Sequence, residues 1–127
     1  MLGLSYKPDT PVVDESPGLL LANQLAADGL PVTVFDPAAN SDARPRLADS
    51  IAVASSTAGC LDASDVAVVT VPWPAFREIP RLLAARPRRR LVIIDCWRLL
   101  DGTSLDGLAQ LVHIGRAPAD VVVPTGV

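Results

Sequence analysis

The chain has 127 residues, half of them hydrophobic but only five aromatic, and its 11 basic and 14 acidic residues give a formal net charge of −3. This length fits one domain with a buried core, and the acidic balance argues against a nucleic-acid partner, which requires a basic face. No apolar run approaches the roughly 20 residues of a membrane-spanning helix, no signal peptide is evident, and two cysteines make no disulfide framework. We therefore expect a soluble cytoplasmic domain with neither a nucleic-acid nor a membrane partner.

The first 17 residues predict a strand, a long loop and the start of a helix. Leu2, Leu4 and Tyr6 are typical of the end of a buried strand. Polar and proline residues follow up to Asp14, and Ser16-Pro17 then supplies an N-cap hydroxyl and a proline at the first helical position. We expect Met1 to Ser5 to form only a stub of a strand that is nevertheless central in the sheet.

Strands and helices alternate along the rest of the chain, with Gly29 closing the first helix and Asn40 to Asp42 in a loop. The expected strands are 31–35, 51–54, 66–71, 91–94 and an edge strand 111–114, and the expected helical segments are 17–28, 46–49, 57–63, 75–78, 81–85 and 104–109. This alternation predicts an α/β fold, a doubly wound (Rossmann-like) parallel sheet with helices on both faces. We expect a single domain over residues 1–116 and a loose tail over 117–127.

Ligands of open α/β sheets bind beyond the carboxyl ends of the strands, at the point where the winding reverses. There the loop after the first strand carries Tyr6 and Lys7, the next carries Trp73, and a third carries Trp97 and Arg98. Two cations and several flat rings suit a nucleotide diphosphate, because cations bind phosphate and rings stack on a base. The alternative is that Trp97 is a core residue and that Arg98 pairs with Asp101 on the surface.

Other candidate sites receive less support. The basic residues Arg86 and Arg88 to Arg90 precede a strand, at the opposite edge of the sheet, and are predicted to form a solvated turn. Asp36 ends the second strand, where a dinucleotide fold has its ribose-binding acid, but no GxGxxG motif accompanies it. We therefore interpret Asp36 as a turn former and expect this domain alone to bind no NAD. No catalytic or metal-binding constellation is predicted around Cys60, Cys96 or His113.

Several motifs, in order, resemble the C-terminal domain of the UDP-glucose/GDP-mannose dehydrogenase family. They are Tyr6-Lys7, Glu15-Ser16-Pro17, Val34 to Pro37, Ala63 to Asp65 before a strand with Trp73 and Phe76 after it, Asp95 to Arg98, and His113 to Arg116. The resemblance implies a nucleotide-sugar-binding domain of an NAD-dependent 6-dehydrogenase, which oxidises an alcohol to a carboxylate. It also implies that the catalytic cysteine and the NAD site belong to N-terminal and central domains outside this chain, so that the isolated domain is inactive.

Carried over to this chain, the resemblance implies that Tyr6, Lys7, Trp73 and Arg98 contact a UDP- or GDP-linked sugar. The chain departs from the family at Asp14, where the family has an arginine, and at Pro11-Val12, where it has two acids. These changes weaken the expectation of a cofactor-facing role more than that of a nucleotide-facing one. The alternative hypothesis is a divergent, non-enzymatic α/β module that binds a nucleotide or a protein partner. The sugar, the base and the formation of a homodimer are left open.

Overall fold

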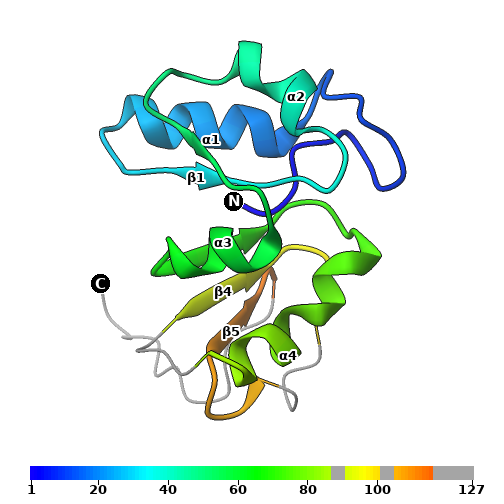
Figure 1. Ribbon diagram of the computed structural model, residues 1–127, viewed down its shortest axis with the longest axis vertical. Helices are drawn as coiled ribbons and strands as arrows, with labels where there is room; N and C mark the ends of the chain where they lie inside the picture. The colour runs from blue at the N-terminus through cyan, green and yellow to red at the C-terminus, as the bar shows by residue number, and fades with distance from the viewer. Residues whose placement is uncertain (87–90, 101–104, 116–127) are drawn as a thin grey trace, which may run out of the picture.

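The computed structural model describes residues 1–86, 91–100 and 105–115, and its strands are all parallel (Figure 1). Strand β1 (Thr33–Val34) pairs with β2 (Ala52–Val53), and β3 (Val66–Val69) pairs with β4 (Val92–Asp95), which pairs with the edge strand β5 (Gln110–His113). The predicted fold class is therefore confirmed.

A single segment at the amino terminus joins the two groups of strands. Leu2 forms parallel bridges with Phe35 beyond β1 and with Val69 of β3. Its backbone N–H donates to Val68 O at 2.8 Å, and its carbonyl accepts from Thr70 N at 2.9 Å. The strand order is thus β2, β1, the Leu2 segment, β3, β4 and β5, which confirms the predicted central place of Met1 to Ser5, although within it only Leu2 makes β-bridges.

Helices connect the strands and begin at capping residues. The main helix, α1 (Pro17–Ala27), has Ser16 at its N-cap, whose hydroxyl accepts from Leu19 N at 3.2 Å, and Pro17 at its first position. Helix α3 (Thr57–Asp62) begins in the same way, since Ser56 Oγ accepts from Gly59 N at 3.0 Å. The remaining helical elements are α2 (Asn40–Ala43), α4 (Ile79–Ala84) and the 3₁₀ helices η1 (Arg44–Arg46) and η2 (Pro74–Glu78).

Two hydrophobic clusters lie on the two faces of the sheet. Side chains of successive strand residues point to opposite faces, and accordingly Val69 packs in one cluster and Val68 against the other. The first cluster is covered by α3 and α4 and the second by α1 and α2. Helix α1 approaches closely enough that a Cβ atom on Gly18 would lie 2.3 Å from Gly3 O, so this position requires glycine.

Some details differ from the sequence-based expectations. Residues 40–42, predicted as a loop, form α2, because Asp36 Oδ1 accepts from the N–H groups of Ala38 and Ala39 and Asn40 Oδ1 accepts from Asp36 N. The turn expected at 46–49 lies earlier, at η1. Residues 88–90 and the predicted tail 117–127 lie outside the described residues, as do 101–104. Within the part described, no helix is long and apolar enough to cross a bilayer.

Candidate functional site

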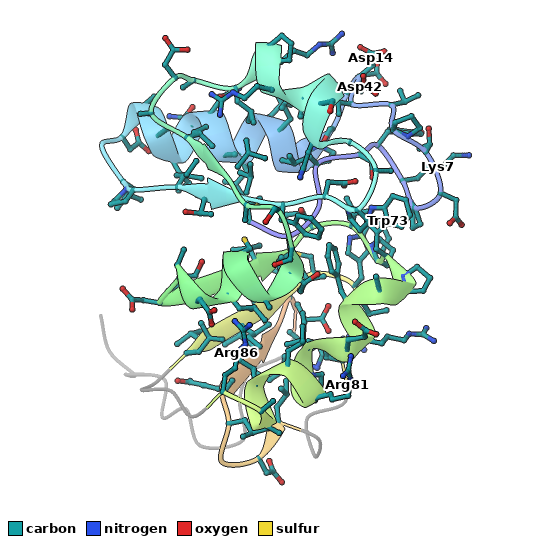
Figure 2. The ribbon with its side chains drawn as sticks, viewed as in Figure 1. Lys7, Asp14, Asp42, Trp73, Arg81 and Arg86 are labelled. Atoms are coloured by element: carbon teal, nitrogen blue, oxygen red, sulfur yellow. The ribbon has the colours of Figure 1, made fainter. Side chains whose placement is uncertain are left out.

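The candidate site lies at the edge of the sheet where the parallel strands end, here called the carboxyl edge. Three loops leave it from neighbouring strands: residues 5–16 after the Leu2 segment, 70–73 after β3 and 96–100 after β4. Neighbouring strands lie about 4.8 Å apart, so the first and third loops begin about 10 Å from each other. Figure 2 shows Lys7 and Trp73 of the first two loops on the same side of the molecule. The topology thus brings together the segments that the sequence predicts to form a site.

Asp36 links the first two of these loops to the end of β1. Its carboxylate is almost completely buried, with 1% of the residue exposed, and both oxygens accept hydrogen bonds. The five donors, at 2.8–3.1 Å, are the backbone N–H groups of Leu4, Ser5, Ala38 and Ala39 and the indole N–H of Trp73. A buried carboxylate with this many donors is satisfied by the protein itself. Asp36 is therefore the turn former that the sequence predicts, and it also fixes two neighbouring loops.

Trp73, which the sequence places among the substrate contacts, is buried. Only 8% of the residue is exposed, and its ring packs in the cluster with α3 and α4. The indole N–H lies 3.1 Å from both Ser5 Oγ and Asp36 Oδ2. The ring therefore offers no free face to a ligand, and Trp73 instead ties the loop after β3 to the loop that carries Lys7.

The turn after β4 is organised by a second buried aspartate. Asp95 Oδ1 accepts from Trp97 N at 3.0 Å, and Oδ2 accepts from Leu100 N at 2.8 Å. His113 Nδ1 lies 3.8 Å from the same Oδ2 and makes no hydrogen bond to the described residues. Trp97 and Arg98, which follow Asp95 in this turn, are both exposed, so the turn places them at the surface. The alternative that Trp97 is a core residue is wrong, since 58% of it is exposed.

The loop of residues 5–16 presents Tyr6 and Lys7 to solvent. Tyr6 is 55% exposed and Lys7 is exposed, with its side chain directed away from the ribbon in Figure 2. The loop is closed by a hydrogen bond of 2.6 Å from Tyr6 N to Val12 O. An ion pair of 2.6 Å joins Asp14 to Arg46 of η1, so the acid found where the family has arginine contacts a cation of this chain.

Backbone strain is concentrated in the same loops. Among the described residues, the non-glycine residues with positive φ are Asp9 (63°), Glu15 (57°) and Arg98 (52°). Two lie in the loop that carries Lys7, and the third is the candidate phosphate ligand itself. Such conformations cost roughly 1–3 kcal/mol each and are enriched at binding sites. The strained positions therefore coincide with two of the three loops of the candidate site.

Two residues that hold the site together were not predicted from the sequence. Ser5 bonds the Trp73 indole, and the Thr70 hydroxyl donates to Gly3 O at 2.6 Å. Neither has a local sequence signal, because each partner lies about 67 residues away in the chain. The alternative that Arg98 pairs with Asp101 involves residue 101, which lies outside the described residues.

The described residues lack two features by which a dinucleotide-binding fold holds its cofactor. In a dinucleotide-binding fold an acid at the end of the second strand binds the ribose, but both oxygens of Asp36 are occupied by protein donors. The loop before α1 has no GxGxxG motif. No group of three or more His, Cys, Asp or Glu side chains suited to a metal occurs in residues 1–86, 91–100 and 105–115. The site at the carboxyl edge therefore offers cations and aromatic rings, which suit a nucleotide's phosphates and base.

Comparison with known proteins gives one consistent result. Residues 1–102 match the profile of the "UDP-glucose/GDP-mannose dehydrogenase family, UDP binding domain". The chain is 29% identical to UDP-glucose 6-dehydrogenase YwqF of Bacillus subtilis, over 99% of this chain and 28% of that protein. It is 33% identical to UDP-glucose 6-dehydrogenase AglM of Haloferax volcanii, over 85% of this chain and 24% of that protein.

A solved structure shows the same likeness. The UDP-glucose dehydrogenase of the hyperthermophilic archaeon Pyrobaculum islandicum superposes with a TM-score of 0.66 and 27% identity, over 88% of this chain and 23% of that one. The chain thus spans about a quarter of the length of the relatives it matches.

Proposed function

Because this chain belongs to the UDP-glucose/GDP-mannose dehydrogenase family and corresponds to its UDP binding domain, we propose that its carboxyl edge holds the nucleotide diphosphate of a nucleotide-sugar. Lys7 and Arg98 bind the phosphates, and Tyr6 lines the same site. Trp73 contributes indirectly, by holding the Lys7 loop through Ser5 and Asp36. Within the whole protein, this domain would position the sugar for oxidation of its C6 alcohol to a carboxylate.

The observation that carries the proposal is the placement of two exposed cations on two loops at the same edge of the sheet. Lys7 follows the Leu2 segment and Arg98 follows β4, and only β3 lies between these strands. Both side chains are exposed and therefore available to an anion, and no ion pair to a described carboxylate occupies either of them. A charge-assisted hydrogen bond to phosphate is worth roughly 1.5–3 kcal/mol.

The oxidation itself requires a nucleophile, a base and a cofactor site, which the described residues of this chain do not bring together. NAD⁺, when bound, would accept one hydride in each of the two oxidations that lead from alcohol to carboxylate, and we propose that other domains of the full-length protein hold it, together with the catalytic residues. The described residues of this chain bind and orient the nucleotide. Accordingly, the isolated chain supplied with UDP-glucose and NAD⁺ should produce no NADH above the background of an absorbance assay.

Titration with UDP and GDP by calorimetry tests the binding proposal. Lys7→Ala and Arg98→Ala should each weaken binding about tenfold or more, which is the loss expected for one charge-assisted bond. Arg81→Ala is the matched control, because Arg81 is an exposed arginine on α4, well away from Lys7 in Figure 2, and it pairs with Glu78 at 3.3 Å. Its removal should change the affinity by less than twofold.

The second candidate, a non-enzymatic module that binds a protein partner, predicts a different outcome. If neither nucleotide binds at millimolar concentration, or if Arg81→Ala weakens binding as much as Lys7→Ala does, the proposed site is wrong. Mapping of chemical shifts provides an independent readout, since shifts should cluster on residues 5–16 and 96–100. Shifts centred on Arg88 to Arg90, which lie outside the described residues, would favour the alternative.

A further inference from the structure

The described structure exposes two of the five aromatic rings of this chain. Phe76 and Trp73 are buried and Phe35 is half-buried, whereas Tyr6 is 55% exposed and Trp97 is 58% exposed. Both exposed rings lie on loops at the carboxyl edge. A single exposed apolar side chain needs no special explanation, so exposure alone does not assign a role to Trp97.

The second observation is that the exposed ring of Trp97 is held at two points. Its backbone N–H donates to Asp95 Oδ1 at 3.0 Å, and its indole N–H donates to Thr70 O at 2.7 Å. The Thr70 hydroxyl in turn donates to Gly3 O at 2.6 Å. The ring is therefore fixed to the loop after β3, which is itself bonded to the Leu2 segment that leads to Lys7.

An exposed ring with a fixed orientation is suited to stacking. Binding to a preorganised side chain avoids most of the entropy cost of ordering it, and a flat aromatic face stacks on any nucleobase. The residue that follows Trp97 is Arg98, the proposed phosphate ligand. A base on Trp97 and a phosphate on Arg98 would then belong to one ligand, in the order in which a nucleoside diphosphate presents them.

Building on the proposed function, we infer that Trp97 is the stacking platform for the nucleobase and the residue through which this site prefers a nucleoside diphosphate to inorganic pyrophosphate. Trp73, by contrast, has its indole N–H bonded to Ser5 and Asp36 and its ring in the core. Of the several rings that the sequence brings to this edge, Trp97 is therefore the exposed one whose indole is held in place by the protein.

Calorimetry with two probes, UDP and inorganic pyrophosphate, tests this inference on the 127-residue chain. Base stacking is worth about 1–3 kcal/mol, so Trp97→Ala should weaken UDP binding between about 5-fold and 150-fold. The same variant should leave the affinity for pyrophosphate within twofold, because pyrophosphate has no base. Trp97→Phe, which keeps a flat ring, should retain most of the UDP affinity, whereas Trp97→Leu, which keeps apolar bulk without a ring, should behave like alanine.

Fluorescence provides a second readout, because the chain contains only two tryptophans and one of them is buried. UDP should protect the exposed tryptophan from acrylamide quenching, and pyrophosphate should not. Leu20→Ala is the matched control: Leu20 is a 67% exposed side chain on α1, and its loss should change neither affinity nor quenching.

The outcomes separate this inference from the proposed function. If UDP binds and depends on Lys7 and Arg98, but Trp97→Ala and Trp97→Leu bind it as the wild type does, the stacking role is wrong and the proposed function stands. Equal losses for UDP and pyrophosphate would mean that Trp97 acts only through the fold of its turn, which also overturns the inference. If the wild type binds neither probe, both proposals fail.

Discussion

Two aspartates at the carboxyl edge end strands in the same way but act over different distances. Asp36 follows β1 and Asp95 ends β4, and both are buried, with 1% and 0% of the residue exposed. The donors to Asp95 lie two and five residues ahead in the chain. Asp36 has equally local donors, but it also accepts from groups 31, 32 and 37 residues away. One carboxylate thus closes its own turn, and the other joins three segments of the chain.

Within one site, the residues around Asp36 support the loops, and the residues around Asp95 are exposed to a ligand. Around Asp36 the neighbouring residues are buried, including Ser5 and Trp73, and they hold the base of the Lys7 loop. Around Asp95 the turn exposes Cys96, Trp97 and Arg98. A carboxylate that is bonded across the fold stabilises the framework, whereas the locally closed turn leaves its side chains exposed to a ligand, with the Trp97 indole held by Thr70 O.

The largest expected effect is that of Asp36→Ala. This substitution leaves four backbone N–H groups without their acceptor, whereas the Trp73 indole keeps Ser5 Oγ, and each orphaned group costs about 1–3 kcal/mol. We expect a loss of at least about 4 kcal/mol in the free energy of unfolding, a large part of the stability of a small domain. Urea denaturation measures it. Asp49→Ala, at an exposed aspartate, is the control and should change stability by less than about 0.5 kcal/mol.

A smaller effect is expected for Asp95→Ala, because it removes the acceptor of only two backbone donors. By the same cost for each group, the loss should be about 2–6 kcal/mol, half of that expected for the four groups at Asp36. Since the backbone N–H of Trp97 is one of these donors, the fluorescence emission of the Trp97 indole should also change. If Asp95→Ala destabilises the chain more than Asp36→Ala does, the proposed contrast between a cross-link and a local turn is incorrect.

The smallest effect concerns thiol reactivity and leaves the fold unchanged. Partial burial, and then the charge of Asp95, raise the pKa of the Cys96 thiol above its ordinary value. Burial likewise raises the pKa of Cys60, which is 1% exposed. Because the thiolate is the reactive form, Cys96 should react slowly with a disulfide reagent at pH 7 and about tenfold faster at pH 8, while Cys60 reacts only on unfolding.

Asp95→Asn tests the cause of the Cys96 shift. Removing the neighbouring negative charge lowers the thiol pKa, so Cys96 should react faster than in the wild type at the same pH. An unchanged rate would indicate that burial alone accounts for the shift.

Local signals in the sequence predict most of the fold. The Ser16-Pro17 start of α1 and the apolar strand around Val68 depend on neighbouring residues and are found where expected. The central place of the Leu2 segment follows from the topology of doubly wound sheets. Local signals also suffice to place Lys7 and Arg98 on loops at one edge.

Long-range bonding is the part that the sequence does not reveal. Trp73 and Trp97 each come soon after an apolar strand, and nothing in their neighbourhood distinguishes them. Trp73 is buried because Asp36 and Ser5 accept its indole N–H from other loops. Trp97 stays exposed because its acceptor, Thr70 O, lies at the edge of the sheet. The sequence shows that rings gather at this edge, but only the tertiary structure identifies the ring that faces a ligand.

The double pairing of Leu2 has a consequence for the order of folding. Its partners Phe35 and Val69 lie 33 and 67 positions further along the chain, so the segment closes two long loops. The pair β1 and β2 and the trio β3, β4 and β5 have partners of their own, and among the residues that the structure describes only this segment joins them within the sheet. Contacts between residues that are far apart in the sequence form late and lower the rate of folding. We therefore expect the two groups of strands to gain structure first, and the barrier to folding to be crossed when the amino-terminal segment enters the gap between them.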